Sequence, residues 1–245
     1  WLVDPENPLT ARVTVNHWWA SLLGRGIVGT VEDFGTRGSR PTHPELLDWL
    51  ASELVESGWS RKRLLREIVL SSTYRQSASP SDGATLERDP ENRLLARNPR
   101  RRLPAESIRD NALALAGILS LEVGGPPAHP LQPPGVWRSN GATPARYKPS
   151  TGEDLRRRGV YTVWRRTSPY PSFVNFDAGD RMTCTPRRSE SNTPLQALTL
   201  LNDEVYRGAA LAFAERILRE RPTDSSEQRI EHAFRIALAR PPSAE

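Results

Sequence analysis

The densest group of side chains able to do chemistry lies between residues 165 and 196. It is rich in arginine and also holds carboxylates, one thiol and two amides: Arg165, Arg166, Asp177, Asp180, Arg181, Cys184, Arg187, Arg188, Asn192 and Gln196. Guanidinium forks bind sulfate, phosphate and carboxylate in bidentate geometry. The segment also ends at a predicted helix N-terminus, where free N–H groups favour an anion. The residues we expect to bind an anionic ligand are Arg165, Arg166, Arg181, Arg187, Arg188, Asn192 and Gln196.

Two other interpretations of this segment stay open. In the first, the arginines tie an irregular stretch of chain to the helices through internal ion pairs. In the second, the segment is catalytic, with Asp177, Arg181, Cys184 and Arg188 as the candidate residues. Cys184 would act as a thiolate, which flanking arginines favour, but no histidine lies near it in sequence to serve as a base.

Other motifs that carry chemistry are absent or out of context. Gly24 to Gly29 spells G-x-G-x-x-G, but a predicted helix precedes it and a loop follows, so we expect helix capping instead of dinucleotide binding. The sequence has no Walker A loop and no G-x-S-x-G elbow. The histidines lack the spacing of a zinc site, and no metal site is predicted: His17, His43, His129 and His232.

The net charge is concentrated in one stretch of the chain. The 245 residues contain 34 Arg and Lys against 29 Asp and Glu, a net charge of +5. Residues 142–190 hold ten of these cations and five of the anions, so the imbalance falls within this segment. Such a concentration indicates an anionic partner or an internal carboxylate network. The only cysteine, Cys184, excludes an internal disulfide, and no apolar run is long enough to span a membrane.

In the first part of the chain, apolar spacing and cap residues predict three helices. Asn7-Pro8 starts the first, which Gly24 and Gly26 end. A capping box from Thr42 to Glu45 starts the second, and Ser60 caps the third. The second and third helices form a helical hairpin. Residues 77–90 are predicted to be a loop, followed by a short helix near 90–97.

Signals in the rest of the chain alternate between helix and irregular structure. Pro104 begins a helix, and the seven prolines of residues 124–149 exclude one there. The β-branched and aromatic run from Gly159 to Trp164 is the one predicted strand. Thr193-Pro194 starts a helix that breaks near Asn202-Asp203, and a capping box from Asp224 to Glu227 starts the last one.

Together these elements predict a mainly α fold with a long Pro/Arg-rich irregular segment and at most a short β element. We expect a single helical domain over residues 1–245, with N-terminal helices in 1–120, the irregular segment in 121–191 and C-terminal helices in 192–245. The chain opens at Trp1 without a targeting signal and stops in a sequence that resembles a helix start. We therefore expect a fragment of a longer polypeptide, truncated at both ends.

Several blocks of sequence, in order, resemble one family. They are Asn7–Arg12, Gly24–Val28, Asp33–Gly35, Pro41–Leu50, Ser71–Gln76, Phe176-Asp177, Asp180-Arg181, Cys184, Arg187-Arg188 and Asn192–Leu198. The chain is similar, over nearly its whole length, to the C-terminal planctomycete domain of unknown function. His17 departs from the pattern, because the resemblance leads us to expect arginine after Asn16.

The resemblance implies an exported protein of the periplasm or cell envelope. Haem c would be held by a separate cytochrome c module, with no cofactor in this chain, and the upstream domains would be partners. It implies no established activity and no catalytic residues.

We expect a binding or scaffold module for an anionic ligand, such as an anionic polysaccharide or a neighbouring domain. The alternative is an enzyme, either a hydrolase or lyase acting on complex carbohydrate or a haem-linked oxidoreductase. Nucleic acid is not an expected partner, because the positive charge is local.

Overall fold

A computed structural model describes the chain except for residues 5, 80–82, 138–145, 186 and 244–245. The described part is mainly α-helical, as predicted, and contains no β-sheet. It forms two compact units, residues 1–101 and 102–245. From the sequence we expected one domain, with its first internal division at residue 120. No helix in the described part is both long and apolar enough to cross a bilayer.

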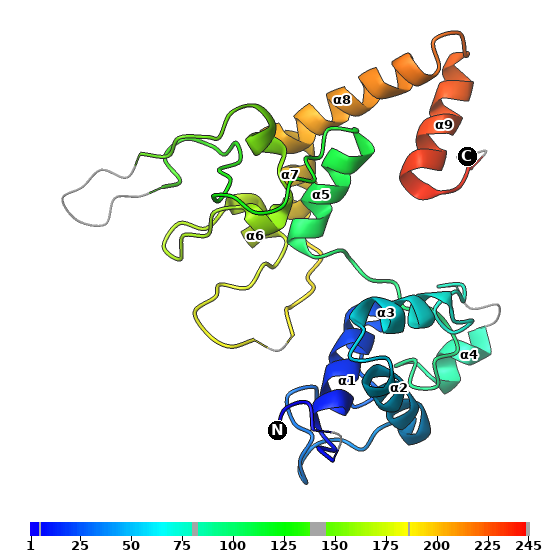
Figure 1. Cartoon of the computed structure of the whole chain (residues 1–245). Coiled ribbons are helices and arrows are strands. Elements are labelled where there is room, and N and C mark those ends of the chain that lie inside the picture. Colours follow the sequence, from blue (N-terminus) through cyan, green and yellow to red (C-terminus); the bar gives the residue numbers. More distant parts are fainter. Residues whose placement is uncertain (5, 80–82, 138–145, 186, 244–245) are drawn as a thin grey trace. The chain divides into compact units, whose positions relative to one another are not determined.

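Unit 1, residues 1–101, is a set of helices around an apolar core (Figure 1). Its helices are α1 (Thr10–Leu23), α2 (Pro44–Glu56), α3 (Arg61–Leu70) and the short α4 (Gly83–Arg88). The apolar stripes of α1, α2 and α3 face one another, and the side chains that are nearly inaccessible include Val15, Leu50, Leu54, Leu64 and Ile68. The helical hairpin of α2 and α3 is confirmed, with Gly58 in the turn at φ 66°.

Gly24 and Gly26 serve the structure of unit 1. Gly24 ends α1 in the left-handed conformation, at φ 80°, as predicted. At Gly26 an added Cβ would lie 2.6 Å from Nδ2 of Asn16. The buried Asn16 amide bonds both backbone groups of Val28: its Nδ2 donates to the Val28 oxygen at 3.1 Å, and its Oδ1 accepts from the Val28 N–H at 2.9 Å. The glycines therefore let the loop pack against α1.

Several predicted details of unit 1 are wrong. The first helix begins at Thr10, although Asn7 Oδ1 does accept the N–H groups of Leu9 and Thr10. Thr42 forms no capping box, because its hydroxyl donates to the Ile27 carbonyl instead. The short helix lies at 83–88 within the predicted loop, and residues 90–97 are not helical. There the Asp89 carboxylate accepts the N–H groups of residues 93 and 94 and folds the chain into a turn.

Unit 2, residues 102–245, combines helices with a long irregular segment. Its α-helices are α5 (Ala105–Leu115), α6 (Pro171–Asn175), α7 (Pro194–Asn202), α8 (Glu204–Glu220) and α9 (Ser226–Leu238), and its 3-10 helices are η1 (Gly152–Arg156) and η2 (Gly159–Tyr161). Two small apolar clusters hold α5 against α6 and against α8. In Figure 1, α8 extends beyond α5 and α9 folds back from its far end.

The predicted strand at 159–164 is wrong. Residues 159–161 form η2, and in the described part this run has only an isolated parallel bridge between Thr162 and Ala128. The reason is tertiary, since Gly159 packs against the backbone of Glu106 and donates its N–H to Asp110 at 2.6 Å. The predicted helix break is confirmed, with Asp203 as the cap of α8. The last capping box is shifted by one residue, to Ser225 and Gln228.

Candidate functional site

Two buried arginines hold the irregular segment of unit 2 in place. Arg109 of α5 is 1% exposed and donates to the carbonyl oxygens of Arg157 at 2.6 Å and Leu155 at 2.7 Å. Arg157 is 2% exposed, donates to the carbonyls of Gly124 and Pro126, and stacks over the Tyr161 ring. Irregular backbone leaves carbonyls without partners, and these two side chains supply the donors.

Sequence reasoning did not single out Arg109 or Arg157. Residue type alone does not distinguish these two from the other arginines of the chain. The available signal was indirect: a proline-rich stretch supplies carbonyls but few N–H groups, so it needs side-chain donors from elsewhere.

Residues 177–191, apart from residue 186, form a loop that one carboxylate closes at its base; it is called the 177–191 loop below. Asp177 accepts the backbone N–H of Ser191 at 2.7 Å and the Ser191 hydroxyl at 2.8 and 2.9 Å. It also pairs with Nη2 of Arg102 at 2.6 Å. Burial acts to raise the pKa of Asp177, but these hydrogen bonds and the Arg102 charge outweigh it, so the pKa lies below its ordinary value. Closed loops of this size are often functional.

Arg188 joins the other side of the 177–191 loop to α5. Its Nη1 and Nη2 donate to the two carboxylate oxygens of Glu106, at 2.7 and 3.1 Å. Burial acts to raise the pKa of Glu106, but the Arg188 hydrogen bond and the nearby charges of Arg188 and Arg181 lower it overall. Arg188 therefore binds the Glu106 carboxylate in the bidentate geometry expected for an anion, and the charge of Arg181 lies nearby.

Two other predicted ligand residues lie over indole rings. The Arg181 guanidinium stands 4.4 Å from the Trp164 ring centroid. The Arg165 guanidinium stands 5.0 Å from the Trp137 ring, which also packs edge-on against Tyr147. Such contacts fix the planes of the guanidinium groups without neutralising their charge.

The remaining predicted ligand residues fall into a buried and an exposed group. Gln196 is buried and donates to the backbone oxygens of Asn175 and Ser191, so it is committed to the structure. Arg166, Arg187 and Asn192 are exposed, and neither arginine forms an ion pair among the residues described. The seven side chains predicted to bind a ligand therefore do not all share one pocket.

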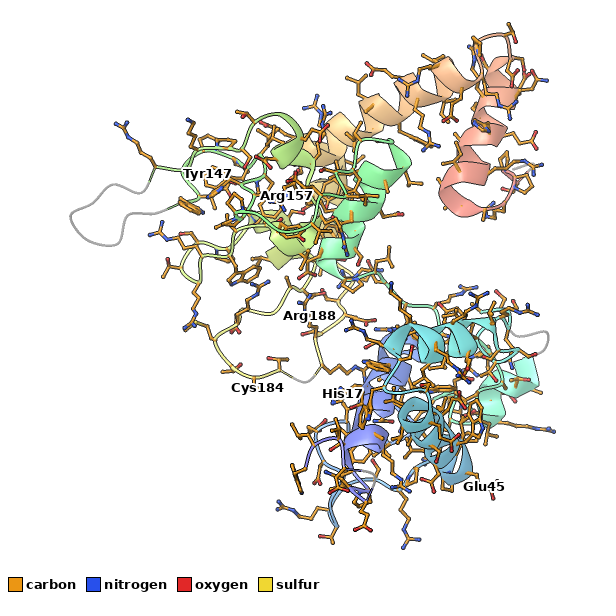
Figure 2. The ribbon with its side chains drawn as sticks, viewed as in Figure 1. His17, Glu45, Tyr147, Arg157, Cys184 and Arg188 are labelled. Carbon is orange, nitrogen blue, oxygen red and sulfur yellow. The ribbon has the colours of Figure 1, made fainter. Side chains whose placement is uncertain are left out.

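Three of the four predicted catalytic residues make contacts with other side chains in the described part of the chain. Asp177 and Arg188 are engaged in the contacts above, and Arg181 lies over Trp164. Cys184 is a free, exposed thiol on the outer part of the 177–191 loop, while Arg188 lies closer to the helices of unit 2 (Figure 2). Within the described ranges no hydrogen bond joins Cys184 to a histidine, and no three His, Cys, Asp or Glu side chains gather as metal ligands.

The surface of the irregular segment is nonetheless cationic. In the described parts of residues 146–190, the exposed cations number eight and the exposed carboxylates four. The cations are Arg146, Lys148, Arg156, Arg158, Arg166, Arg181, Arg187 and Arg188; the carboxylates are Glu153, Asp154, Asp180 and Glu190. The charge excess seen in the sequence therefore reaches the surface.

Comparison with known proteins gives a family and nothing beyond it. The sequence model of PSD1, described as a protein of unknown function (DUF1553), matches residues 1–245. No curated protein and no solved structure matches the chain. Because the match covers the whole length of the chain, the chain belongs to the PSD1 family of proteins of unknown function.

Proposed function

We propose that unit 2 is a binding module for an anionic partner, which it contacts through the exposed cations of its irregular segment. The observation that carries the proposal is that these cations stand on backbone fixed by polar contacts of the buried Arg109 and Arg157 and of the half-buried Asp177. Binding to cations on a fixed backbone costs less conformational entropy than binding to cations on a free tail.

The arrangement favours an extended partner over a small ion. Arg188 is already paired with Glu106, and Arg165 and Arg181 lie over different rings, so no single cluster of free guanidinium groups surrounds one anion. A chain of carboxylates or sulfates, or the acidic surface of a protein, can contact cations that are spread over a surface. An anionic polysaccharide and the upstream domains of the same polypeptide are the partners we propose.

The setting comes from the family resemblance. We propose that the chain is part of an exported planctomycete protein of the periplasm or cell envelope, whose haem c is held by a separate cytochrome c module. There the module would hold its partner near the haem-bearing part of the polypeptide. The enzymatic alternative, a carbohydrate hydrolase or lyase or a haem-linked oxidoreductase, draws no support from the contacts of Asp177, Arg188 and Cys184 described above.

The test is binding of a labelled dextran sulfate to the full chain at rising salt. Arg181→Gln/Arg187→Gln removes two exposed cations of the 177–191 loop, and Arg61→Gln/Arg66→Gln removes two exposed cations of unit 1 as a matched control. We expect the loop variant to bind about tenfold more weakly at low salt and the control to change less than about twofold. Equal losses in both variants, or binding that ignores salt, would contradict the proposal.

A further inference from the structure

Arg165 is a half-buried arginine without an oxygen partner. Six arginines of unit 2 are buried or half-buried in the described part of the chain. Five of them donate to carbonyl or carboxylate oxygens: Arg102, Arg109, Arg157, Arg216 and Arg229. The sixth, Arg165, forms no side-chain hydrogen bond or ion pair within the described residues. Partial burial of a charge costs free energy that a counterion offsets, so this side chain points to an anionic ligand.

The contact of Arg165 with Trp137 leaves its donors available. The guanidinium lies 5.0 Å from the centroid of the indole ring. A contact of this kind restricts where the guanidinium can lie but gives none of its five N–H groups to an oxygen. Two parallel N–H groups of one guanidinium match the two oxygens of a carboxylate. The side chain is therefore held in place and still able to bind an anion.

Trp137 belongs to a cluster of three half-buried rings, His129, Trp137 and Tyr147, called the ring cluster. The Trp137 ring centroid lies 5.9 Å from that of His129 and 5.0 Å from that of Tyr147. The His129 and Tyr147 centroids are 5.6 Å apart. Because the three rings are only partly buried, each presents some aromatic surface to a ligand that binds at Arg165.

Backbone hydrogen bonds hold the ring cluster beside Arg165. The Ala128 carbonyl accepts the N–H of Val163, two residues before Arg165, at 2.8 Å. The Ser150 N–H donates to the His129 carbonyl at 2.9 Å, and the Ser150 hydroxyl accepts the His129 N–H at 3.0 Å. The site thus draws on stretches of chain that are separate in the sequence and that the fold brings together.

The sequence around this site is cationic and nearly free of carboxylates. Residues 123–152 and 155–176 contain no Asp or Glu and hold eight Arg or Lys. The two acidic residues between these stretches, Glu153 and Asp154, are both exposed. The positive potential of these stretches favours an anion at Arg165.

The combination of rings and guanidinium favours one kind of anion. A sulfate or phosphate group uses charge and N–H donors and needs no aromatic surface. The face of an aromatic ring carries negative charge density and attracts C–H groups. A uronate residue uses both features, because its carboxylate is attached to a sugar ring whose faces carry C–H groups. An acidic peptide offers the carboxylate without the ring.

We infer that Arg165 and the ring cluster bind one uronate residue of an anionic polysaccharide. The N–H groups of Arg165 donate to the uronate carboxylate, and the rings of Trp137 and Tyr147 contact its sugar ring. Arg146, Lys148 and Arg166 are exposed next to Tyr147 and Arg165 in the sequence and supply charge for neighbouring uronates. The inference rests on the proposed function, an anionic partner, and it names the class of polysaccharide and its site.

Two short ligands of equal charge test the inference on the full chain. An oligogalacturonate carries its carboxylates on sugar rings, and an oligoglutamate with blocked ends carries them without rings. Arg165→Gln removes the guanidinium, Arg165→Lys keeps the charge without the planar fork, and Arg166→Gln makes the same charge change at the exposed neighbour. Isothermal titration calorimetry measures the binding, and circular dichroism melting checks that each variant is folded.

We expect the natural chain to bind the oligogalacturonate about tenfold more tightly than the oligoglutamate. Arg165→Gln should lose this preference, Arg165→Lys should lose most of it, and Arg166→Gln should keep it. Equal binding of both ligands by the natural chain overturns the inference, as does a preference that survives in full in either Arg165 variant or is lost equally in Arg166→Gln. An oligonucleotide of the same charge that binds more tightly than the oligogalacturonate overturns it in favour of nucleic acid.

Dextran sulfate separates the inference from the proposed function. If dextran sulfate binds in a salt-dependent way and the oligogalacturonate and oligoglutamate bind equally, the proposed function stands and the uronate site is rejected. If neither dextran sulfate nor the oligogalacturonate binds, both are rejected.

Discussion

Each of the two units of this chain is stabilised by a different kind of contact. In unit 1 the packed surfaces are apolar side chains on regular helices, and the inaccessible residues are mostly leucine, isoleucine, valine and tryptophan. In unit 2 the apolar clusters are small, and the largest side chains buried there include Arg109 and Arg157, which bond to backbone carbonyls. Regular helices satisfy their own backbone groups, whereas irregular chain needs donors from elsewhere.

The difference teaches why arginine is abundant in a region without regular structure. An arginine offers five N–H donors in a fixed plane, so one side chain can satisfy several carbonyls of an irregular segment. Arginines used in this way are buried, and those left over reach the surface as the charge excess of residues 146–190. The proposed binding residues and the internal donors are therefore both arginines, and they differ only in whether the fold buries them.

The largest expected effect is in the polar interior of unit 2. Arg109→Met keeps most of the volume but leaves the carbonyls of Leu155 and Arg157 without their donor, and we expect a loss of about 4 kcal/mol in the unfolding free energy of unit 2. Amide hydrogen exchange with mass spectrometry should show faster exchange in residues 150–165 and unchanged exchange in α1–α3. Arg156→Met, at an exposed neighbouring site, is the control. Unchanged exchange in residues 150–165 would show that Arg109 is not a support.

The matching change in unit 1 is Leu54→Ala. Leu54 is fully buried in the apolar core, so its truncation leaves a cavity, and we expect a loss of about 3 kcal/mol. The same exchange measurement should now show faster exchange in α1–α3 alone. Leu70→Ala, at a site 57% exposed, should change little. If Leu54→Ala loosened unit 2 as strongly as unit 1, the division into two separately stabilised units would be wrong.

A polar contact inside unit 1 sharpens the comparison. Asn16→Ala removes both hydrogen bonds to Val28 and leaves its backbone groups unpaired, so we expect a loss of about 2 kcal/mol. The change should appear as faster exchange in residues 24–31, with the α2–α3 hairpin less affected. Ser21→Ala, also on α1, is the exposed control. Intact protection of residues 24–31 in Asn16→Ala would show that the Asn16 amide does not hold this loop.

The smallest expected effect is at the base of the 177–191 loop. The pKa of Asp177 is lowered in the folded state. The ionised carboxylate therefore stabilises the fold above the ordinary carboxyl pKa of about 4, and this stabilisation is lost as the pH falls through the folded-state pKa. We expect Asp177→Asn to remove about 1 kcal/mol at neutral pH.

An NMR titration of the Ser191 amide measures this contact. In the natural chain the amide signal should move as the pH drops below about 4, and in Asp177→Asn it should lie near the acid position at every pH. Asp180→Asn, on the same loop, serves as the control. A Ser191 signal that ignores pH in the natural chain would show that Asp177 does not close the loop.

The helices of this chain were largely predictable, and their details were less so. The ends marked by Gly24, Pro44, Gly58 and Pro194 are correct because glycine and proline act through the local backbone alone. The capping box at Thr42 and the strand at 159–164 failed for the opposite reason. In each case a distant partner, the Ile27 carbonyl or helix α5, competed for the same groups.

The candidate site divides in the same way. The sequence located the arginine-rich segment and its charge excess, because composition is independent of folding. It could not separate Arg188, which pairs with Glu106, from its neighbour Arg187, which forms no ion pair within the described residues. Nor could it show that Gln196 is buried or that Arg109 supports the segment, since both depend on contacts between residues far apart in the chain.

By itself the sequence determined which stretches are helical, where glycine and proline interrupt them, and where positive charge gathers. The tertiary structure decided which arginines are internal donors and which face the solvent, and it decided that α7 exposes Leu195, Leu198 and Leu201. The physical reason is that local propensity and charge belong to single residues. Burial and hydrogen bonding belong to pairs of residues, which only the folded chain brings together.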